Sequence, residues 1–533
     1  MDIKILKKGD VLKAIKDEGF ISAWKTLAKE SGEFTLIQEY DFVASWYRAY
    51  QSIYDPIMLV AYGQQNKILG ILPLAISLEN GEISHAGDGQ AEYNSWICSK
   101  KNEKTFLVQS LILLKKELNL VKWDWGWMPP NANISWLKSK ELEQNGIYVN
   151  VGTFESPRYD LNDLARITKI KKSKSIRSNT NRLKRSGDLK IERITDVARA
   201  KEVFVDLKKI YNFRNLAVYN NIPFEEDECK ERWHLDHLLN SNDSVHFSIL
   251  WQGDNLLACN FGFCSDTTVM MGLFAYNPVQ GARSPGNIFL IMLTEYIAKE
   301  GFQYLDLTPG GDPYKERFCN DHITLSKPIF FFNQWTKYKN NALIYIKNKI
   351  KEKYSYRDII KLKTSLEQKL KGAILNKSRN NSGDKYELFL YSPDKDKPNH
   401  LELGFQKFED LLLYKNNQSH KKRTDVVFEA LKNFERDDHL YTLVRDEELI
   451  AYAWVSTSKR KHFDAKINEL ITIVGSSALI YDLFFVKGVD KNFMFDFLHN
   501  VLNNYAEESD VYLVKPLLVT DKEMLNHGYN KNT

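Results

Sequence analysis

The strongest constraint on the fold of this chain is a pattern that occurs three times. An apolar stretch, a short polar turn and a second apolar stretch recur at residues 59–76, 247–263 and 441–457. In each copy a small residue stands where the second stretch begins: Gly70, Ala258 and Ala451. Two apolar runs joined by a short polar turn are typical of a β-hairpin. We therefore expect three antiparallel hairpins.

A second shared pattern follows each hairpin. An apolar helix that leads directly into a strand is predicted at residues 106–127, 288–307 and 493–516. The order of hairpin, further strand, helix and strand is typical of a mixed sheet with a crossover helix on its face. The sequence therefore predicts an α/β protein with mixed sheets of the α+β kind, built from three similar units.

The spacing of these units predicts the domain boundaries. A chain of 533 residues is too long for one hydrophobic core. We expect a first domain at residues 1–160, a second at 161–334, a linker at 335–384 and a third domain at 385–533. The linker has apolar residues at helical spacing among many lysines, which predicts a basic amphipathic helix.

Composition and chain start favour a cytoplasmic protein. The chain is 43% hydrophobic and 27% charged, as expected for folded domains. Its first residues, MDIKILKKGD, lack the apolar core of a signal peptide, and the apolar run Ile288–Leu293 is far too short to span a membrane. The basic segment 337–379 could still contact the inner face of a membrane peripherally, or serve only as a solvated helix face.

The five cysteines do not form a recognisable pattern. They are Cys98, Cys229, Cys259, Cys264 and Cys319, without CxxC pairs or an accompanying series of histidines. This argues against a disulfide framework and against a zinc site, so no metal cofactor is expected.

A phosphate-binding turn is predicted at the start of the second predicted helix. Pro285 suits the first helical turn because its missing N–H would have no partner there, and Ser284 can cap. Gly286 lets an anion approach the free backbone amides, and Arg283 adds positive charge. With Asn287, these residues are the candidate site for an anionic carrier; an ordinary capped helix is the alternative.

Several of these features together resemble a known family. They are the basic segment 173–187, the hairpin at Phe247, Ser284-Pro285-Gly286, and the run with Asp306-Leu307, Gly310-Gly311, Tyr314-Lys315 and Phe318. As a set, over about residues 33–332, they resemble the tandem GNAT fold of the BioF2-like acetyltransferases. That family includes CelD-type proteins and is related to the FemAB/FemX aminoacyl transferases. The third unit resembles a divergent GNAT domain whose helix start offers no phosphate nest.

The resemblance implies a reaction. A GNAT fold holds the pyrophosphate of acyl-CoA at the start of its central helix, so the donor is expected to be acyl-CoA, most simply acetyl-CoA, with Lys315 as a further phosphate contact. The acceptor is expected to be an amino group on a sugar nucleotide, a glycan or a similar polar molecule, in polysaccharide biosynthesis. Because no Ser-His-Asp order or GxSxG motif is present, direct attack by the amine is favoured over a covalent enzyme intermediate.

Three side chains are candidates for acid–base chemistry. Asp306 ends a predicted strand, where it could orient the acceptor amine or act as a base through water; alternatively, it caps the following turn. Tyr314 is the candidate acid for the leaving group. His246 is a candidate base, although a lone histidine is more often structural.

Other polar residues are candidates for acceptor binding. The loop 85–96 carries Asp88, Glu92, Tyr93 and Asn94, and its alternative is an ordinary solvated loop. Asn260 lies inside an apolar predicted strand and Tyr276 ends another. A polar residue in such a strand either joins a buried hydrogen-bond network or faces a cleft.

Two further hypotheses stay open. The donor could be an aminoacyl-tRNA, as in FemX, which would give the basic segments a partner. Alternatively, the chain is a non-catalytic binding or assembly component whose basic helix contacts a membrane or another protein.

Overall fold

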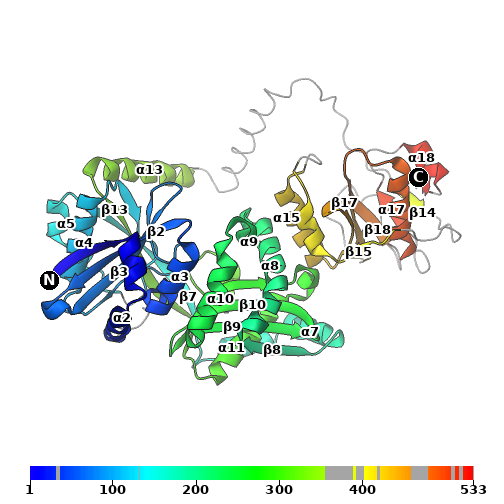
Figure 1. The fold of residues 1–533 in the computed structure, drawn as a ribbon. Helices are drawn as coiled ribbons and strands as arrows, with labels where there is room; N and C mark the ends of the chain where they lie inside the picture. Colours follow the sequence, from blue (N-terminus) through cyan, green and yellow to red (C-terminus); the bar gives the residue numbers. More distant parts are fainter. Residues whose placement is uncertain are drawn as a thin grey trace.

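The computed structural model describes residues 1–31, 36–130, 132–353, 388–391, 401–416, 421–457, 478–505, 511–514, 520–527 and 529–531. The described strands form three sheets with helices on their faces (Figure 1). This arrangement confirms the predicted α/β class with mixed sheets.

The first sheet contains the first predicted hairpin. Its order is β1-β2-β3-β4, and β5 also pairs with β3. The strands are β1 (Asp2–Lys7), β2 (Tyr54–Tyr62), β3 (Ile68–Ser77), β4 (Ile83–His85) and β5 (Ile97–Cys98). The helices are α1 (Lys8–Ala14), α2 (Glu18–Glu30), α3 (Tyr40–Tyr50), α4 (Glu103–Glu117) and α5 (Lys140–Gln144), with the short 3-10 helices η1 (Leu36–Gln38), η2 (Gln64–Asn66) and η3 (Ser135–Lys138). Alternate residues of β2 face α3 on one side and α4 on the other.

The second sheet joins the first two predicted domains. Its order is β6-β13-β7-β12-β11-β10-β9-β8, and β9 and β10 form the second predicted hairpin. The strands are β6 (Lys122–Asp124), β7 (Tyr148–Asp160), β8 (Leu189–Ile194), β9 (Val245–Gln252), β10 (Asn255–Cys264), β11 (Thr268–Tyr276), β12 (Tyr304–Asp306) and β13 (Asp321–Phe331). Strand β7 lies between β12 and β13, so sheet pairing crosses the boundary predicted at residue 160. The domain boundaries themselves stay a prediction.

Two long helices cover opposite faces of this sheet. They are α8 (Val197–Tyr219) and α11 (Pro285–Lys299), the latter being the predicted crossover helix (Figure 1). Phe247 and Ile249 of β9 pack in one core with α8, whereas Leu250 packs in another with α11, as the alternation of a strand requires. The remaining helices are α6 (Ala165–Lys171), α7 (Lys174–Arg185), α9 (Pro223–Glu226), α10 (Cys229–Asn240), α12 (Pro313–Phe318), α13 (Gln334–Lys353), η4 (Asn242–Ser244) and η5 (Pro278–Arg283).

The third sheet repeats the topology of the second in shorter form. Its order is β15-β16-β17-β18-β19-β14-β20, with the third predicted hairpin at β16 and β17. Strands β18 and β19 are parallel, with α17 between them in sequence, as β11 and β12 are with α11. The strands are β14 (Leu388–Tyr391), β15 (Gly404–Phe405), β16 (His439–Arg445), β17 (Glu448–Ser456), β18 (Ala478–Phe485), β19 (Val511–Val514) and β20 (Tyr529–Lys531). The helices are η6 (Phe408–Leu413), α15 (Arg423–Glu435), α17 (Lys491–Asn503) and α18 (Asp521–Asn526).

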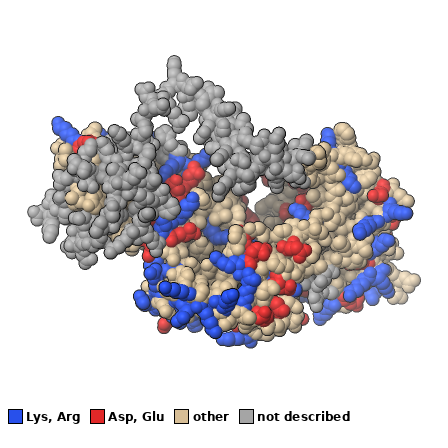
Figure 2. All heavy atoms as spheres, turned by 180° about the vertical axis from the view of Figure 1, so that it is seen from behind, with Lys and Arg blue, Asp and Glu red and all other residues tan. Residues whose placement is uncertain are grey.

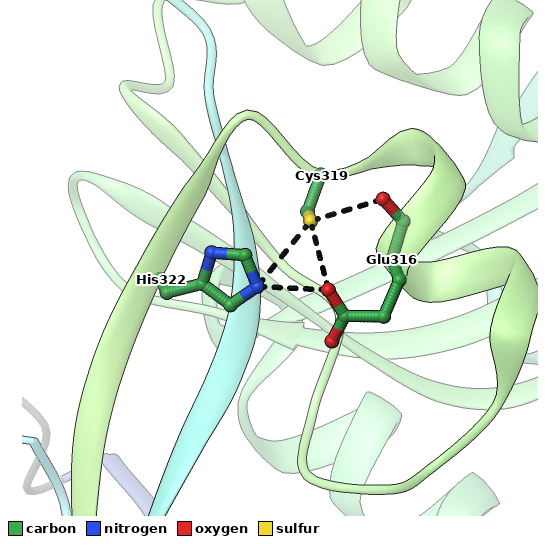
Figure 3. A group of neighbouring side chains, drawn as sticks. All are labelled: Glu316, Cys319 and His322. Atoms are coloured by element: carbon green, nitrogen blue, oxygen red, sulfur yellow. Dashed lines mark hydrogen bonds and ion pairs between the residues drawn. The ribbon is translucent and has the colours of Figure 1, made fainter.

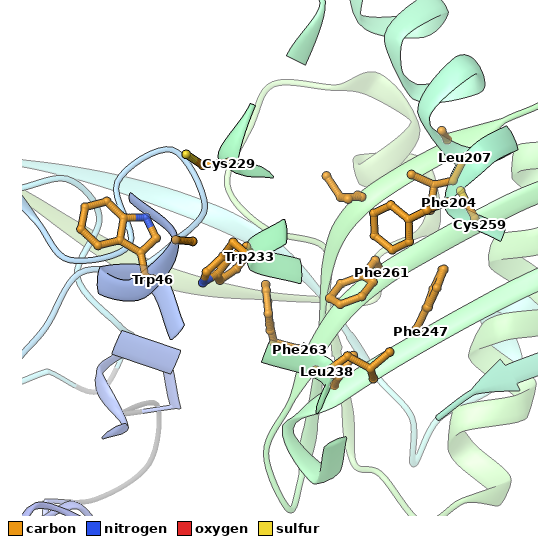
Figure 4. Close-up of a cluster of buried hydrophobic side chains, with 14 of the residues drawn as sticks. Trp46, Phe204, Leu207, Cys229, Trp233, Leu238, Phe247, Cys259, Phe261 and Phe263 are labelled. Carbon is orange, nitrogen blue, oxygen red and sulfur yellow. The ribbon is translucent and has the colours of Figure 1, made fainter. Parts of the chain in front are cut away.

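One continuous hydrophobic core connects the sheets. Trp46 of α3 and Trp233 of α10 belong to the same buried cluster as Phe261 of β10 and Phe204 of α8 (Figure 4). The same cluster includes Phe434 of α15. The three units therefore share buried apolar surface.

Helix α15 of the third unit packs on the second unit. The ring of Phe434 lies 6.3 Å from that of Phe213 on α8, edge to face. Next to this contact, Arg283 of η5 forms an ion pair with Asp437 at 2.6 Å. The third unit therefore lies against the segment that precedes α11.

The predicted basic linker is only partly described. Helix α13 covers its first part, with the exposed aromatic side chains Trp335, Tyr338 and Tyr345. Residues 354–384 of the predicted linker lie outside the described residues. Among the described helices, none combines the length and the apolar character needed to cross a membrane.

We predict that Phe330→Ala strongly destabilises the protein. Phe330 of β13 is fully buried among Trp125 and Trp136 of the first unit, so its removal leaves a cavity where the two units meet. The free energy of unfolding, measured with urea, should fall by about 3–5 kcal/mol. Val151→Ala, on an exposed position of the neighbouring β7, should change it by no more than about 0.5 kcal/mol. If the two substitutions lowered the free energy of unfolding equally, β13 would not join the cores of the first two units.

Candidate functional site

The candidate site is a cavity where two parallel strands separate. Strands β11 and β12 pair only from Thr268–Tyr304 to Met270–Asp306. Beyond this point lies a cavity of about 330 Å³. It is lined by Glu92 of the first unit, by Tyr211, Arg214, Asn215 and Tyr219 of α8, by Met271, Gly272 and Phe274 of β11, and by residues 307–312, Tyr314 and Lys315.

The local backbone explains why the strands separate. The pairing of β10 with β11 is interrupted between Phe261 and Phe263. A Cβ atom on Gly272 would lie 2.3 Å from the Phe261 carbonyl oxygen, so only glycine fits at this bulge. On the other strand, Thr308 has a φ of 63°, which turns the chain away immediately after Asp306.

Asp306 connects the first unit to the end of β12. The Tyr93 hydroxyl donates a hydrogen bond of 2.7 Å to one carboxylate oxygen, and the Thr308 N–H donates one of 2.8 Å to the other. Burial raises the pKa of Asp306, while these two hydrogen bonds act to lower it. Both carboxylate oxygens are thus engaged, so Asp306 is placed to position Tyr93 and the turn at Thr308.

Lys315 is buried on the loop that follows β12. Its ammonium group donates hydrogen bonds to the Thr308 carbonyl oxygen at 3.1 Å and to the Thr308 hydroxyl at 3.2 Å. Burial lowers the pKa of Lys315, and the nearby carboxylates of Asp312 and Glu92 raise it. Lys315 therefore stabilises the loop and adds positive charge at the cavity.

Glu92 brings a carboxylate of the first unit into the cavity. Burial raises its pKa, and the positive charge of Lys315 partly opposes this shift. Within the described ranges, no hydrogen bond or ion pair is found for this carboxylate. Glu92 therefore has a free carboxylate with increased basicity, which suits a general base.

Helix α8 contributes residues that the sequence analysis did not select. Tyr211, Asn215 and Tyr219 recur every four residues and therefore lie along one helical face, together with Arg214. In the part of the chain that the structure describes, Arg214 has no ion-pair partner. The spacing of these aromatic and polar residues at four-residue intervals was the available signal, but the sequence did not indicate which sheet edge they would face.

The predicted residues separate into two groups. Asp306 contacts Tyr93 directly, and Glu92, Tyr314 and Lys315 line the cavity. Tyr314 stacks on Phe274 with ring centroids 6.1 Å apart, and burial raises the pKa of its hydroxyl.

Four other predicted residues do not line this cavity: Asp88, Asn94, Asn260 and Tyr276. Asp88 accepts a hydrogen bond of 3.1 Å from Tyr54 in an exposed part of its loop. Asn260 accepts one of 3.2 Å from the Gly272 N–H and so supports the bulge, whereas its buried Nδ2 has no hydrogen-bond partner among the described residues.

His246 lies elsewhere. Its Nε2 is 2.8 Å from the Glu300 carboxylate, just beyond the C-terminal end of α11, and its Nδ1 is 3.1 Å from the Ser248 hydroxyl. Burial lowers the pKa of His246, although Glu300 opposes the shift. This placement agrees with a structural role for His246, the alternative to a catalytic base, and it separates His246 from the residues that line the cavity.

The predicted phosphate-binding turn faces the third unit. The expectation that the Ser284 side chain caps α11 is wrong: Ser284 has a φ of 53° and makes no side-chain cap bond. Arg283 is engaged by Asp437, and Asn287 accepts a hydrogen bond of 3.1 Å from Arg317. A Cβ atom on Gly281 would lie 3.3 Å from the Glu435 backbone. Phosphate binding at residues 283–287 stays a prediction.

Comparison with known proteins identifies the domain that carries this cavity. Residues 171–316 match the Acetyltransf_6 family model, described as an acetyltransferase (GNAT) domain. This segment is a GNAT domain. It includes α8, the diverging strands β11 and β12, α11 and the loop with Lys315.

The solved structures that match this chain are distant from it in sequence. FemX is 9% identical, with 64% of this chain and 99% of that chain covered and a TM-score of 0.39. A tandem GNAT protein from the clavulanic acid biosynthesis pathway is 8% identical over 61% and 98%, with a TM-score of 0.36. L-PGS from Bacillus licheniformis is 9% identical over 59% and 91%, with a TM-score of 0.36. A search of curated proteins returned no match.

We predict that Asp306 makes stability depend on pH. Because burial raises its pKa in the folded state above the usual 3.8, the folded state holds the proton more tightly than the unfolded state. The contribution of Asp306 to stability is therefore greatest below about pH 4 and is lost as the pH rises through the raised pKa.

Urea unfolding at several pH values tests this. In Asp306→Asn, the loss of stability with rising pH should be smaller than in the wild type, by up to about 1.4 kcal/mol per unit of pKa shift. Asp88→Asn, in the exposed part of the Tyr93 loop, is the matched control and should follow the wild type. Parallel curves for Asp306→Asn and the wild type would contradict the prediction.

Proposed function

We propose that the protein is an N-acyltransferase that moves an acyl group, most simply acetyl, from acyl-CoA to an amino group of a polar acceptor. The cavity at the separation of β11 and β12 carries this proposal, because it combines a free carboxylate, two cations and a tyrosine hydroxyl. The GNAT domain over residues 171–316 supports chemistry of the acyltransferase type. A sugar nucleotide or glycan acceptor, as in polysaccharide biosynthesis, fits this polar lining.

Glu92 is the proposed general base. Its carboxylate accepts a proton from the acceptor ammonium group, which frees the nitrogen lone pair. The nitrogen attacks the thioester carbonyl carbon and forms a tetrahedral oxyanion. When the carbon–sulfur bond breaks, coenzyme A leaves as its thiolate, and the attacking nitrogen releases its second proton to solvent to give the neutral amide. The raised pKa of Glu92 favours the first step, since it makes the carboxylate more basic.

Arg214 and Tyr314 complete the proposed reaction. The guanidinium group of Arg214 supplies positive charge that stabilises the oxyanion. The Tyr314 hydroxyl donates its proton to the leaving thiolate, and its raised pKa keeps this proton in place until then. Lys315 and Asp306 act as positioning residues, since both hold the turn at Thr308.

The donor phosphates have two candidate positions. One is the cavity rim, where Arg214 would contact the phosphates instead of the oxyanion. The other is the turn at residues 284–286, which adjoins the contact between Arg283 and Asp437 of the third unit. Binding at the turn would require an approach that avoids α15, whereas binding at the rim would not.

Thermal unfolding with coenzyme A tests the proposal. Coenzyme A at about 100 times its Kd should stabilise the folded protein by about 2.7 kcal/mol and raise the melting temperature. Arg214→Met should weaken binding by about 10- to 100-fold, because it removes a charged hydrogen-bond donor from the cavity. Lys201→Met, which removes an exposed cation from the same helix outside the cavity, should bind as the wild type does. No stabilisation of the wild type at millimolar concentrations would reject acyl-CoA as the donor.

A second candidate function uses an aminoacyl-tRNA as the donor. It is favoured by a basic surface on α6 and α7, visible at the lower left of Figure 2. The exposed cations of this surface are Lys169, Lys172, Lys174, Arg177, Arg182, Lys184 and Arg185. No ion pair is found between these side chains and any described residue. Such a surface suits the phosphate backbone of RNA.

RNA binding at several salt concentrations tests this candidate. The triple variant Lys172→Ala, Arg177→Ala and Lys184→Ala should bind tRNA more weakly. It should also lower the slope of log K against log salt by about two to three, since each lost phosphate contact contributes about 0.7 to 0.9. Replacing Lys100, Lys101 and Lys104, which are equally exposed but lie near the start of α4, is the matched control. If neither coenzyme A nor RNA binds, the third hypothesis of a non-catalytic assembly component is favoured.

A further inference from the structure

Three metal-ligating side chains converge beside the candidate site. Glu316 lies on α12, Cys319 follows this helix directly, and His322 lies near the start of β13 (Figure 3). His322 Nε2 is 2.9 Å from a Glu316 carboxylate oxygen and 3.7 Å from Cys319 Sγ. The Cys319 Sγ atom is 3.8 Å from the same oxygen. The thiol sulfur, the imidazole Nε2 and one carboxylate oxygen thus face a common point.

These separations approach those of a zinc site. With Zn–S bonds of about 2.3 Å and Zn–N or Zn–O bonds of about 2.0 Å, tetrahedral angles place sulfur about 3.5 Å from nitrogen or oxygen. The same bond lengths and tetrahedral angles place nitrogen about 3.3 Å from oxygen. Each observed separation differs from these values by no more than about 0.4 Å. Small side-chain rotations would therefore suffice for one ion to contact all three ligands.

The Cys319 thiol also donates to the Glu316 backbone carbonyl oxygen at 3.4 Å, a bond that metal binding would replace. The other surroundings leave the three ligands available. The nearby cation Arg166 donates to the backbone carbonyl oxygens of Glu316 and Arg317, so it does not occupy the Glu316 carboxylate. Asp321, next to His322, is engaged by Arg158 at 2.5 Å. The side chains of Glu316 and His322 are about half exposed, at 54% and 41%, which gives an ion access from solvent.

We propose that Glu316, Cys319 and His322 bind a Zn²⁺ ion, with water as the fourth ligand. On binding, the Cys319 thiol releases its proton to solvent and His322 coordinates as the neutral imidazole. A thiolate, an imidazole and a carboxylate match the ligand preferences of Zn²⁺ better than those of Mg²⁺ or Ca²⁺. The ion would fasten the end of α12 to β13.

The position of the site would let a bound ion restrain residues of the candidate site. Helix α12 also carries Tyr314 and Lys315, which line the cavity. An ion that fixes the end of this helix would restrict the movement of both side chains. The zinc proposal does not depend on the acyltransferase proposal, since it concerns only the ligands themselves.

Metal analysis of the full-length protein tests the inference. After chelator treatment, incubation with Zn²⁺ and gel filtration, the wild type should retain about one zinc per chain by mass spectrometry. Cys319→Ser and His322→Gln should both lose it. Cys264→Ser is the matched control, because its thiol is bonded to the Asp243 carbonyl oxygen at 3.2 Å, outside the cluster, and this variant should retain zinc.

Cobalt provides a second readout that depends on the thiolate. Co²⁺ bound to the wild type should give the charge-transfer absorption of a cobalt–thiolate bond, and this band should be absent in Cys319→Ser. His322→Gln changes only a half-exposed ring, so it tests the site even if Cys319→Ser does not fold. A wild type that retains no zinc, or variants that retain as much as the wild type, would overturn the proposal.

Discussion

The position of strand β7 determines how the first two units are placed relative to each other. β7 is the last strand of the first predicted unit, but it pairs with β12 on one side and with β13 on the other. Backbone hydrogen bonds along β13 fix its register, and a shift by one residue would turn every buried side chain to the opposite face. Because of this pairing, the loop with Glu92 and Tyr93 reaches the end of β12. The hydrogen bond from Tyr93 to Asp306 is the direct result.

The chemistry of the candidate site depends on the separation of two parallel strands. A paired sheet leaves no space for a ligand, whereas the bulge at Gly272 and the turn at Thr308 open a cavity at the ends of β11 and β12. Burial at this position shifts the basicity of the groups around it: the pKa of Glu92 is raised and that of Lys315 is lowered. Opposed shifts of neighbouring titratable groups are common at catalytic sites, which is consistent with the proposed function.

The third unit changes the interpretation of the helix start. Seen in the sequence alone, Ser284-Pro285-Gly286 is an open turn at the start of an apolar helix. In the structure, the ion pair between Arg283 and Asp437 and the packing of Phe434 on α8 place the third unit against the segment before α11. A repeat of the same fold thus serves here as a packing partner for the second unit. This arrangement also explains why the most apolar face of α15 is buried.

The sequence by itself determined the repeated elements. The three hairpins, and the crossover helices α11 and α17 with their mixed sheets, follow from local periodicity, which depends only on neighbouring residues. The mixed sheet expected for the first unit is wrong: the described strands of its sheet pair antiparallel, and β6, the strand after α4, pairs with β13 in the second sheet. It also selected Glu92, Tyr93 and Asp306 as candidates, because polar residues at strand ends and in glycine-bearing loops stand out from their surroundings. Tyr314 and Lys315 were selected as part of the motif that carries the family resemblance. It missed the Arg214 face of α8 and the convergence of Glu316, Cys319 and His322. Only the tertiary structure showed that strands of the first two units share one sheet, that His246 lies outside the cavity and that the third unit packs on η5. Each of these depends on contacts between residues far apart in the chain, which no local sequence pattern records.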